Sequence, residues 1–199
     1  AVDVLRELSS ASVQMCVTSP PYWGLRDYKC EGQIGLEPTL AEFIGKLVDV
    51  FREVRRVLRD DGTAWVNMGD SMAGSGKGPT GANGIQRAEE RQGFTDRRTE
   101  ELPAKNLLGV PWRLAFALQD DGWILRQDII WCKGASFGPF HGSVMPESVT
   151  DRCTKSHEYL FLLAKSPKYY FDQDAVRERF SDERMGASGA RTGTPEQFA

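Results

Sequence analysis

The sequence predicts an α/β fold with a mainly parallel sheet, and three observations lead to that prediction. Short apolar runs typical of buried strands alternate along the chain with segments whose apolar residues recur every three or four positions, as in amphipathic helices. Strands joined through helices need crossover connections, which favour a parallel sheet with helices on both faces. The chain has 199 residues, 40% of them hydrophobic, which is enough for a folded core and excludes global disorder.

The expected elements follow one another along the whole first part of the chain. Helices are expected over residues 2–8, 40–58 and 107–118, and strands over 13–18, 63–68, 123–131, 158–164 and 169–171, the last two as an antiparallel hairpin. Pro20 and Pro21 end the first strand, because proline has no N–H to donate to a strand ladder. Thr39 is a suitable N-cap for the long amphipathic helix, which Asp60-Asp61-Gly62 ends.

Two segments lack the periodicity of either helices or strands. Residues 71–104 are rich in Gly, Ser, Thr and charged side chains, so a long loop is expected there, either mobile and functional or disordered. Residues 176–199 carry almost no apolar periodicity and are expected to be a linker or the start of a further region. Residues 1–175 are therefore expected to hold the folded domain.

Composition excludes several classes of protein. A net charge of −3 argues against a large basic surface, although a local basic groove stays open. No stretch approaches the roughly 20 apolar residues of a membrane span, and the N-terminus does not have the pattern of a signal peptide. The cysteines are scattered at positions Cys16, Cys30, Cys132 and Cys153. Without a C-x-x-C pair, and with His141 and His157 far apart, we expect free thiols, no metal site and a cytoplasmic protein.

The most informative segment follows the first strand and reads Val17-Thr18-Ser19-Pro20-Pro21-Tyr22-Trp23-Gly24. Two consecutive prolines after a buried strand make a rigid, extended turn and leave carbonyl groups that need partners outside the sheet. Ser19 adds a hydroxyl group, and the two aromatic residues add flat apolar faces. Ligands of such sheets lie beyond the carboxyl ends of the strands, so this turn offers acceptors to the amino group of a planar ring. The alternative is a proline-stiffened turn whose aromatic residues fill the core.

This octet resembles motif IV, the Ser/Asp/Asn-Pro-Pro-Tyr signature, of the DNA methyltransferases that modify exocyclic amino groups. Thr-Ser-Pro-Pro-Tyr-Trp most resembles the N4-cytosine subset. Residues 51–71 resemble the family's motif V, residues 106–133 its motifs VI and VII, and residues 145–172 its motif VIII with a hairpin. The resemblance implies a Rossmann-like fold that uses S-adenosyl-L-methionine and that is incomplete in this chain.

The resemblance also implies a reaction. The amino group of a base is a poor nucleophile, because its lone pair is delocalised into the ring. Hydrogen bonds from its two protons to the Ser19 hydroxyl and the Pro20 carbonyl favour a tetrahedral nitrogen, which attacks the methyl sulfonium in line. The base must leave the duplex first, and Tyr22 is expected to stack on it. Serine cannot remove the proton as a carboxylate can, so proton loss to solvent is expected after transfer.

Site residues follow from the same resemblance. The implied catalytic residues are Ser19, Pro20, Pro21 and Tyr22, the implied cofactor contacts are Thr18, Ser19 and Asp70, and the implied DNA or base-pocket contacts are Trp23, Arg152, Lys155 and His157. Asp70 either binds the cofactor or caps a turn, and His157 either lines the base pocket or is structural. The basic residues of the long loop either stay solvated among glutamates or bind DNA phosphates; they are Arg87, Arg91, Arg97, Arg98 and Lys105.

Several other chemistries are disfavoured. The carbon-5 cytosine methyltransferases use a cysteine that follows a proline, and the chain has no Pro-Cys pair. The segment Gly74-Ser75-Gly76-Lys77-Gly78 fails the phosphate-loop pattern, which needs Gly in place of Ser71 and Ser or Thr in place of Gly78. A glycine loop for the cofactor is a second interpretation of that segment, with a flexible loop as the default.

The implied partner is double-stranded DNA, with restriction-modification as the context. The family's Phe-x-Gly-x-Gly cofactor loop and its target-recognition region are not evident, so the chain is expected to be the N-terminal catalytic portion of the permuted motif order. Residues 176–199 would then begin the recognition region. A missing region or a second chain would supply the cofactor loop, and an exposed strand edge would allow a homodimer. Adenine N6 as target, a non-catalytic fragment, and methylation of an amide or of RNA stay open as alternatives.

Overall fold

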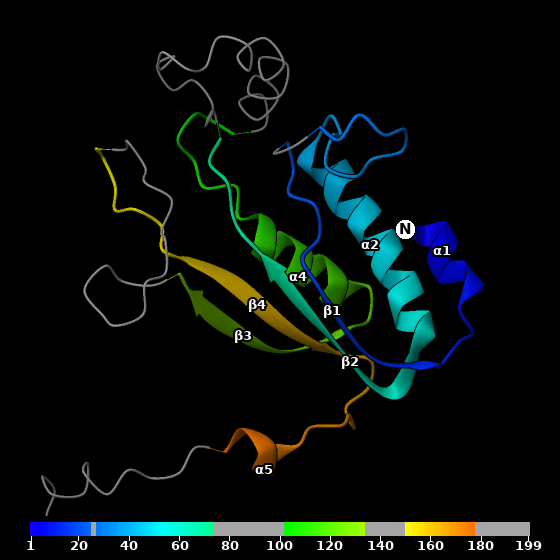
Figure 1. The fold of residues 1–199 in the computed structure, drawn as a ribbon. Helices are drawn as coiled ribbons and strands as arrows, with labels where there is room; N and C mark the ends of the chain where they lie inside the picture. Colours follow the sequence, from blue (N-terminus) through cyan, green and yellow to red (C-terminus); the bar gives the residue numbers. More distant parts are fainter. Residues whose placement is uncertain (25–26, 74–101, 134–149, 178–199) are drawn as a thin grey trace, which may run out of the picture.

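The structure is a computed structural model, and it describes residues 1–24, 27–73, 102–133 and 150–177 (Figure 1). In these residues the elements run in the order α1 (Val2–Glu7), β1 (Val13–Thr18), α2 (Leu40–Val57), β2 (Leu58–Met68), α4 (Val110–Asp120), β3 (Ile124–Cys132), β4 (His157–Ala164) and α5 (Gln173–Val176). The α/β class predicted from the sequence is confirmed. β2 begins directly where α2 ends rather than at residue 63, and the short helix α5 has no counterpart among the expected elements.

The sheet is mixed, with strand order β1-β2-β4-β3. β1 and β2 are parallel, and Cys16 lies beside Ala64. β4 is antiparallel to both of its neighbours, β2 and β3. The expectation of a mainly parallel sheet is therefore wrong for the described residues, because β4 enters between β2 and β3 in the reverse direction.

The expectation of a hairpin after β4 is also wrong. Residues 169–171 form no strand; the Tyr170 N–H instead donates to the Asp61 carbonyl oxygen at 3.0 Å. The physical reason is that β2 and β3 already occupy both edges of β4, so a returning strand would have no free edge to pair with.

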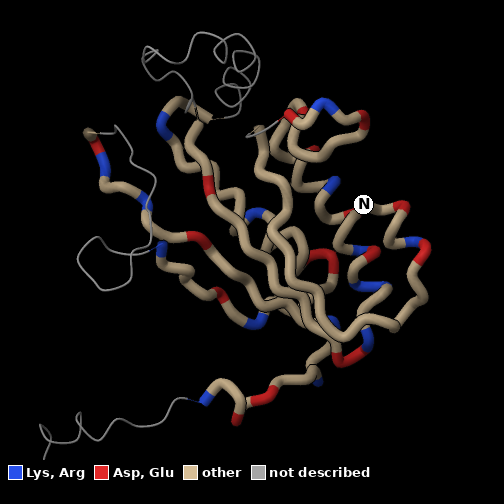
Figure 2. Tube along the Cα trace, in the orientation of Figure 1, with Lys and Arg blue, Asp and Glu red and all other residues tan. Residues whose placement is uncertain are grey.

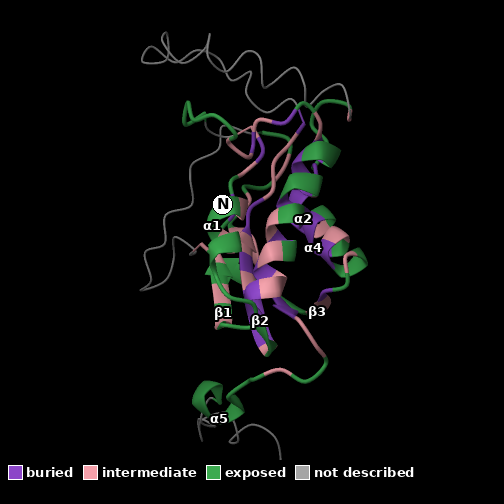
Figure 3. Ribbon diagram, turned by 90° about the vertical axis from the view of Figure 1, so that its right-hand side faces the viewer, coloured by how far each residue is buried: buried purple, intermediate pink, exposed green. Residues whose placement is uncertain are grey.

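The core lies between one face of the sheet and the helices α2 and α4. α2 begins as predicted: the Thr39 side chain accepts a hydrogen bond from the Glu42 N–H at 3.2 Å. One side of α2 is buried along its length, through Leu40, Phe43, Ile44, Leu47, Val48, Phe51, Val54 and Val57. These residues meet the sheet residues Ala64, Val66, Met68 and Leu163 and the α4 residues Val110, Leu114 and Leu118. Figure 3 shows the buried residues along β2 and on the helices beside it.

No helix in the described part of the chain covers the opposite face of the sheet. Met15, Val17 and Trp131 belong to that face by their register, and their exposed fractions are 54%, 67% and 55%. The expectation of helices on both faces is therefore wrong for the described residues. The reason is that α2 and α4 both pack on one face, as their shared core shows.

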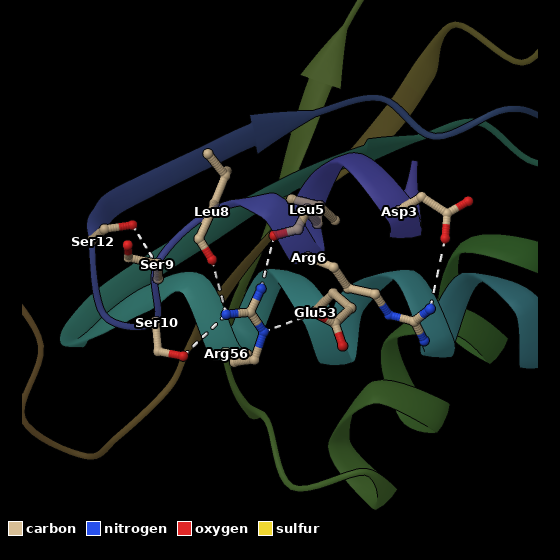
Figure 4. Close-up of polar contacts among 9 residues, drawn as sticks. All are labelled: Asp3, Leu5, Arg6, Leu8, Ser9, Ser10, Ser12, Glu53 and Arg56. Atoms are coloured by element: carbon tan, nitrogen blue, oxygen red, sulfur yellow. Dashed lines mark hydrogen bonds and ion pairs between the residues drawn. The ribbon is translucent and has the colours of Figure 1, made fainter.

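Arg56 of α2 joins α1 to the rest of the fold (Figure 4). Its guanidinium donates to the carbonyl oxygens of Leu5 at 2.8 Å and Leu8 at 3.0 Å, and to the Ser10 hydroxyl at 3.0 Å. Glu53, one turn earlier, accepts from Arg56 Nε at 2.8 Å. Backbone hydrogen bonds at Ala11 and Ser12 then lead the chain into β1. This one side chain fixes the entry to the strand that ends at Thr18.

The two ends of the predicted loop 71–104 lie side by side. The Ala73 N–H donates to the Asn106 carbonyl oxygen at 2.7 Å, and the Lys105 N–H donates to the Ala73 carbonyl oxygen at 2.9 Å. A bridge between Met72 and Leu107 continues this pairing.

Within the described ranges, none of the helices has the length and apolar character needed to cross a membrane.

Candidate active site at the strand ends

The Ser19-Pro20-Pro21-Tyr22 corner begins where β1 ends. The carboxyl ends of β1, β2 and β3 and the start of β4 lie at the same end of the sheet (Figure 1). Pro20 is buried, Tyr22 is half-buried, and Ser19 and Pro21 are exposed. The buried proline anchors the turn, so that the Ser19 hydroxyl stands at the surface on a fixed backbone.

Tyr22 lies against the end of β2. The Tyr22 hydroxyl oxygen lies 3.3 Å from the position that a Cβ atom of Gly69 would occupy. Burial raises the pKa of the Tyr22 hydroxyl, and the nearby charge of Glu158 raises it further, while polar interactions with the Gly69 backbone and Ser19 and the charge of Lys133 lower it. Because the net effect is upward, Tyr22 keeps its proton at neutral pH and can both donate and accept a hydrogen bond.

Gly69 is the point where three of these segments converge. A Cβ atom there would lie 3.1 Å from Tyr22 Cε2 and 3.2 Å from Glu158 Oε1. Glu158, on β4, forms an ion pair with Lys133, which follows β3, and 2.5 Å separates Lys133 Nζ from Glu158 Oε1. Neither of these residues is among those predicted from the sequence. No periodicity or motif spacing signals them, since the pair forms only through the antiparallel register of β3 and β4.

A buried carboxylate holds the loop behind the corner. Trp23 is only 3% exposed, and its Nε1 donates to the Glu37 carbonyl oxygen at 3.0 Å. Glu37 Oε2 accepts from the Gly35 N–H at 2.8 Å, and its Oε1 lies 3.2 Å from Lys46 Nζ. Gly35 has φ +108°, and its carbonyl oxygen accepts from the Gly24 N–H at 2.7 Å. Trp23, implied above as a DNA or base contact, thus fills the core below the corner.

Asp70 acts as a cap on α4. Its Oδ1 accepts from the backbone N–H groups of Ser71 and Val110, each at 2.9 Å. The N-cap residue of α4 is Gly109, which has no side chain to cap with, so Asp70 supplies the missing acceptor from the end of β2. The Asp70 side chain is 1% exposed, and Lys155 Nζ lies 3.9 Å from Oδ2. Of the two alternatives for Asp70, the structure shows capping.

His157 and Lys155 join an aromatic group beside α4. The Tyr159 ring lies 5.6 Å from Trp112 and 5.4 Å from His157, measured between ring centroids. Lys155 Nζ lies 5.5 Å from the Tyr159 centroid, a cation–π distance. Because neighbouring strand residues point to opposite faces, His157 and Tyr159 lie on the helix-packed face, away from Glu158. Both predicted residues therefore contact this group in the structure.

The remaining predicted residues are not brought to the corner by any described contact, apart from Thr18, the half-buried last residue of β1. Arg152 Nη1 donates to the Cys153 carbonyl oxygen at 3.0 Å. Lys105 pairs with Asp151 at 2.5 Å, and this contact raises the pKa of Lys105 and lowers that of Asp151. Outside the described residues lie His141, the segment 74–78, Arg87, Arg91, Arg97 and Arg98.

In the described part of the chain, no group of three His, Cys, Asp or Glu side chains could hold a metal ion. All four cysteines are free thiols. Burial raises the pKa of the Cys16 thiol, which makes it a poorer nucleophile at neutral pH.

Comparison with known proteins gives the family. The DNA methylase family model matches residues 13–194. The chain belongs to the DNA methylase family. Two relatives of the chain are the Type II methyltransferases M.Cfr9I of Citrobacter freundii, 52% identical over 89% of the chain, and M.SmaI of Serratia marcescens, 48% identical over 96%. The chain spans 56% of the length of M.Cfr9I and 63% of M.SmaI.

Solved structures share the fold of the chain. A Thermus thermophilus protein assigned as a DNA modification methylase, solved with S-adenosyl-L-methionine, matches with a TM-score of 0.53 and 21% identity. It covers 92% of the chain, which spans 59% of that protein. The PvuII DNA methyltransferase, described as cytosine-N4-specific, matches with a TM-score of 0.52 and 15% identity over 84% of the chain and 47% of its own. At these identities the likeness concerns the fold alone.

Proposed function

We propose that the whole protein transfers a methyl group from S-adenosyl-L-methionine to the exocyclic amino group of a base flipped out of double-stranded DNA, with cytosine N4 as the target. Family membership supports amino-methylation of DNA. The observation that carries the proposal is the exposed Ser19 hydroxyl on a proline-fixed turn at the carboxyl end of β1. Sheets of this class bind their ligands at this end.

Each residue of the corner has a separate proposed role in binding the base and its amino group. The Ser19 Oγ and the Pro20 carbonyl oxygen accept one amino proton each, which draws the nitrogen towards a tetrahedral geometry and frees its lone pair. Pro20 and Pro21 restrict the backbone, so both acceptors stand in place before the base arrives. Tyr22 adds a half-buried aromatic ring beside them, on whose face the base can stack for about 1–3 kcal/mol.

Thr18 and Ser19 are the described residues proposed to face the cofactor, whose sulfonium supplies the methyl group. The groups at this corner are compatible with the cofactor. The corner presents neutral hydroxyl and carbonyl groups, and its carboxylate, Glu158, is paired with a lysine. Asp70 is left out, since its Oδ1 is engaged by two backbone N–H groups. We also propose that the described sheet is part of a Rossmann-like domain, supported by the parallel pair β1 and β2 and by the fold likeness.

DNA is proposed to reach the corner without a broad basic surface. Figure 2 shows acidic and basic residues interspersed along the described chain, in keeping with the net charge of −3. Binding therefore depends on local cations near the strand ends, of which Lys133 and Lys155 are the described candidates. Such binding should weaken as salt rises, with a shallow slope because few phosphates are neutralised.

The test uses the full-length protein with labelled cofactor and duplex DNA, followed by digestion to nucleosides and mass spectrometry. N4-methylcytosine is the expected product. N6-methyladenine would move the target to adenine, and no label in either base would refute the enzyme. Ser19→Ala should lower the rate by about 100-fold, in the range found for loss of one positioned hydrogen bond. Ser12→Ala, an exposed serine just before the same strand, is the matched control and should retain full activity.

A further inference from the structure

We propose that Glu37 is a positioning residue for methyl transfer, whose buried carboxylate fixes Gly35 against the backbone of the Ser19-Pro20-Pro21-Tyr22 corner. Glu37 is assigned no contact with the base or the cofactor. It acts through the backbone of the corner, which has to hold two acceptors in place for the amino group of the base. The inference rests on the proposed function and adds to the site a residue from outside the corner.

Gly35 lies directly against the backbone of the corner. A Cβ atom at Gly35 would be 3.1 Å from the Tyr22 carbonyl oxygen and 3.7 Å from Pro21 Cβ, so there is little room for a side chain. The φ of +108° at Gly35 also favours glycine. The neighbouring atoms belong to the Tyr22 backbone and to the rigid ring of Pro21, so a shift of Gly35 would be passed on to the turn. Gly35 therefore supports the corner through direct contact.

Hydrogen bonds hold both backbone polar groups of Gly35. Its N–H donates to Glu37 Oε2 at 2.8 Å, and its carbonyl oxygen accepts from the Gly24 N–H at 2.7 Å. The Glu37 backbone adds a third connection, since its carbonyl oxygen accepts from Trp23 Nε1 at 3.0 Å. Trp23 and Gly24 directly follow Tyr22 in the chain. The segment 35–37 is therefore bonded to both residues that follow the corner, and the carboxylate fixes the glycine that contacts the corner itself.

The charge of Glu37 points to positioning rather than to packing. Its side chain is 1% exposed, and its Oε1 lies 3.2 Å from Nζ of Lys46, an exposed residue of α2. Burying a carboxylate costs solvation free energy that an ion pair often fails to return, so such a pair is a poor source of net stability. A charged acceptor does, however, bind an N–H group more strongly than a neutral one. Because α2 packs in the core, the pair ties Gly35 to a fixed helix.

The first test compares two glycines in methyl transfer by the full-length protein at saturating DNA and cofactor. Gly35→Ala puts a methyl group against the Tyr22 carbonyl oxygen and should lower kcat by about 10- to 100-fold, as expected when positioned groups are displaced. KM for DNA should stay within about twofold. Gly32→Ala is the matched control, because Gly32 also has a positive φ, +71°, but nothing lies within 4 Å of the new Cβ. Equal losses in the two variants, or no loss in Gly35→Ala, would overturn the inference.

The second test removes the charge of Glu37 and keeps the shape of its side chain. Glu37→Gln should lower kcat per folded molecule on the order of tenfold, because a neutral amide holds the Gly35 N–H less firmly. Val54→Ala, a buried truncation near the other end of α2, controls for stability: it should lower the unfolding temperature and leave kcat unchanged. Combining Glu37→Gln with Ser19→Ala should cost less than the product of the separate losses, since both act on the same amino group. Losses that multiply fully would contradict the positioning role.

Amide hydrogen exchange, followed by NMR without DNA or cofactor, tests the contact independently of activity. Glu37→Gln should speed exchange at Gly35 on the order of tenfold and leave the amides of α2 unchanged. Unchanged exchange at Gly35 would overturn the inference.

The outcomes separate the inference from the proposed function. A wild-type protein that transfers no methyl group refutes the proposed function. An active wild type with an equally active Glu37→Gln variant refutes only the positioning role. A raised KM for DNA with unchanged kcat would also refute it, because Glu37 would then act on DNA binding rather than on the amino group.

Discussion

The helix-packed face of the sheet and the strand-end corner consist of different types of residue. Between the sheet and the helices α2 and α4, nearly every buried side chain is apolar and comes from a regular element. At the corner, polar and charged groups gather at the ends of four strands, among them the Tyr22 hydroxyl, the Gly69 backbone, Lys133 and Glu158. The first region stabilises the fold without specific directions, whereas the second positions individual atoms.

This difference predicts two separable kinds of variant. Truncation on the helix-packed face should lower the free energy of unfolding, and activity should fall only as far as folded protein is lost. Small polar changes at the corner should lower activity and leave stability nearly unchanged. The variants below test that separation.

Phe43→Ala should have the largest effect. Phe43 is fully buried on α2, so truncation leaves a cavity and should cost about 3–5 kcal/mol of unfolding free energy. The matched control is Phe116→Ala on α4, where the ring is 52% exposed and the cost should be less than about 1 kcal/mol. Urea denaturation measures both. Equal losses would show that burial on this face does not determine stability.

Asp70→Ala should come next. The change removes an acceptor that is 1% exposed and leaves the N–H groups of Ser71 and Val110 without it, which should cost about 1–3 kcal/mol. Asp120→Ala, an exposed aspartate at the other end of α4, should cost far less. Thermal unfolding compares the two variants. If Asp70→Ala folds with wild-type stability but fails to bind cofactor, the cofactor-binding alternative is correct and capping is not the role of Asp70.

Gly69→Ala should act on the corner rather than on the core. A methyl group there would press on the Tyr22 ring and the Glu158 carboxylate, so kcat should fall by about tenfold, equivalent to about 1.4 kcal/mol. Gly45→Ala, in α2 with nothing within 4 Å of the new Cβ, is the matched control and should be neutral or stabilising by up to about 1 kcal/mol. Methyl-transfer kinetics and denaturation together decide. A Gly69→Ala variant with normal turnover would remove Gly69 from the site.

Thr39→Ala should have the smallest effect. It deletes the side-chain acceptor for the Glu42 N–H at the start of α2 and should cost about 1 kcal/mol. Thr39→Ser keeps the acceptor and should retain most of the stability. Circular dichroism on heating measures the difference. Because α2 belongs to the helix-packed face, turnover per folded molecule should not change, and a selective loss of turnover would contradict the separation of the two regions.

The same contrast explains what could be predicted from the sequence. Periodicity alone gives α2 almost to the residue, because its packing depends on one apolar stripe. The direction of β4 could not be predicted, since an apolar run has the same pattern in a parallel and in an antiparallel strand. The hairpin at 169–171 was wrong for a related reason: local turn residues cannot show that both edges of β4 are occupied.

Within the candidate site, local motifs could be predicted and distant contacts could not. The corner from Ser19 to Tyr22 is contiguous, so its position at the end of a strand followed from the prolines. The cap that Asp70 places on α4 joins residues 40 positions apart, and the Lys133–Glu158 pair depends on strand register. The burial of Trp23 could not be predicted either, because an aromatic residue next to a motif carries no sign of whether it faces the site or the core.

The most direct test is a crystal structure of the full-length protein bound to duplex DNA and to a cofactor analogue that cannot donate its methyl group. The target base should lie outside the duplex, with its amino nitrogen about 2.7–3.2 Å from both the Ser19 Oγ and the Pro20 carbonyl oxygen. The Tyr22 ring should contact the base, and Glu158 should stay paired with Lys133. A base that binds elsewhere, or one whose amino group faces away from Ser19, would contradict the role assigned to this corner.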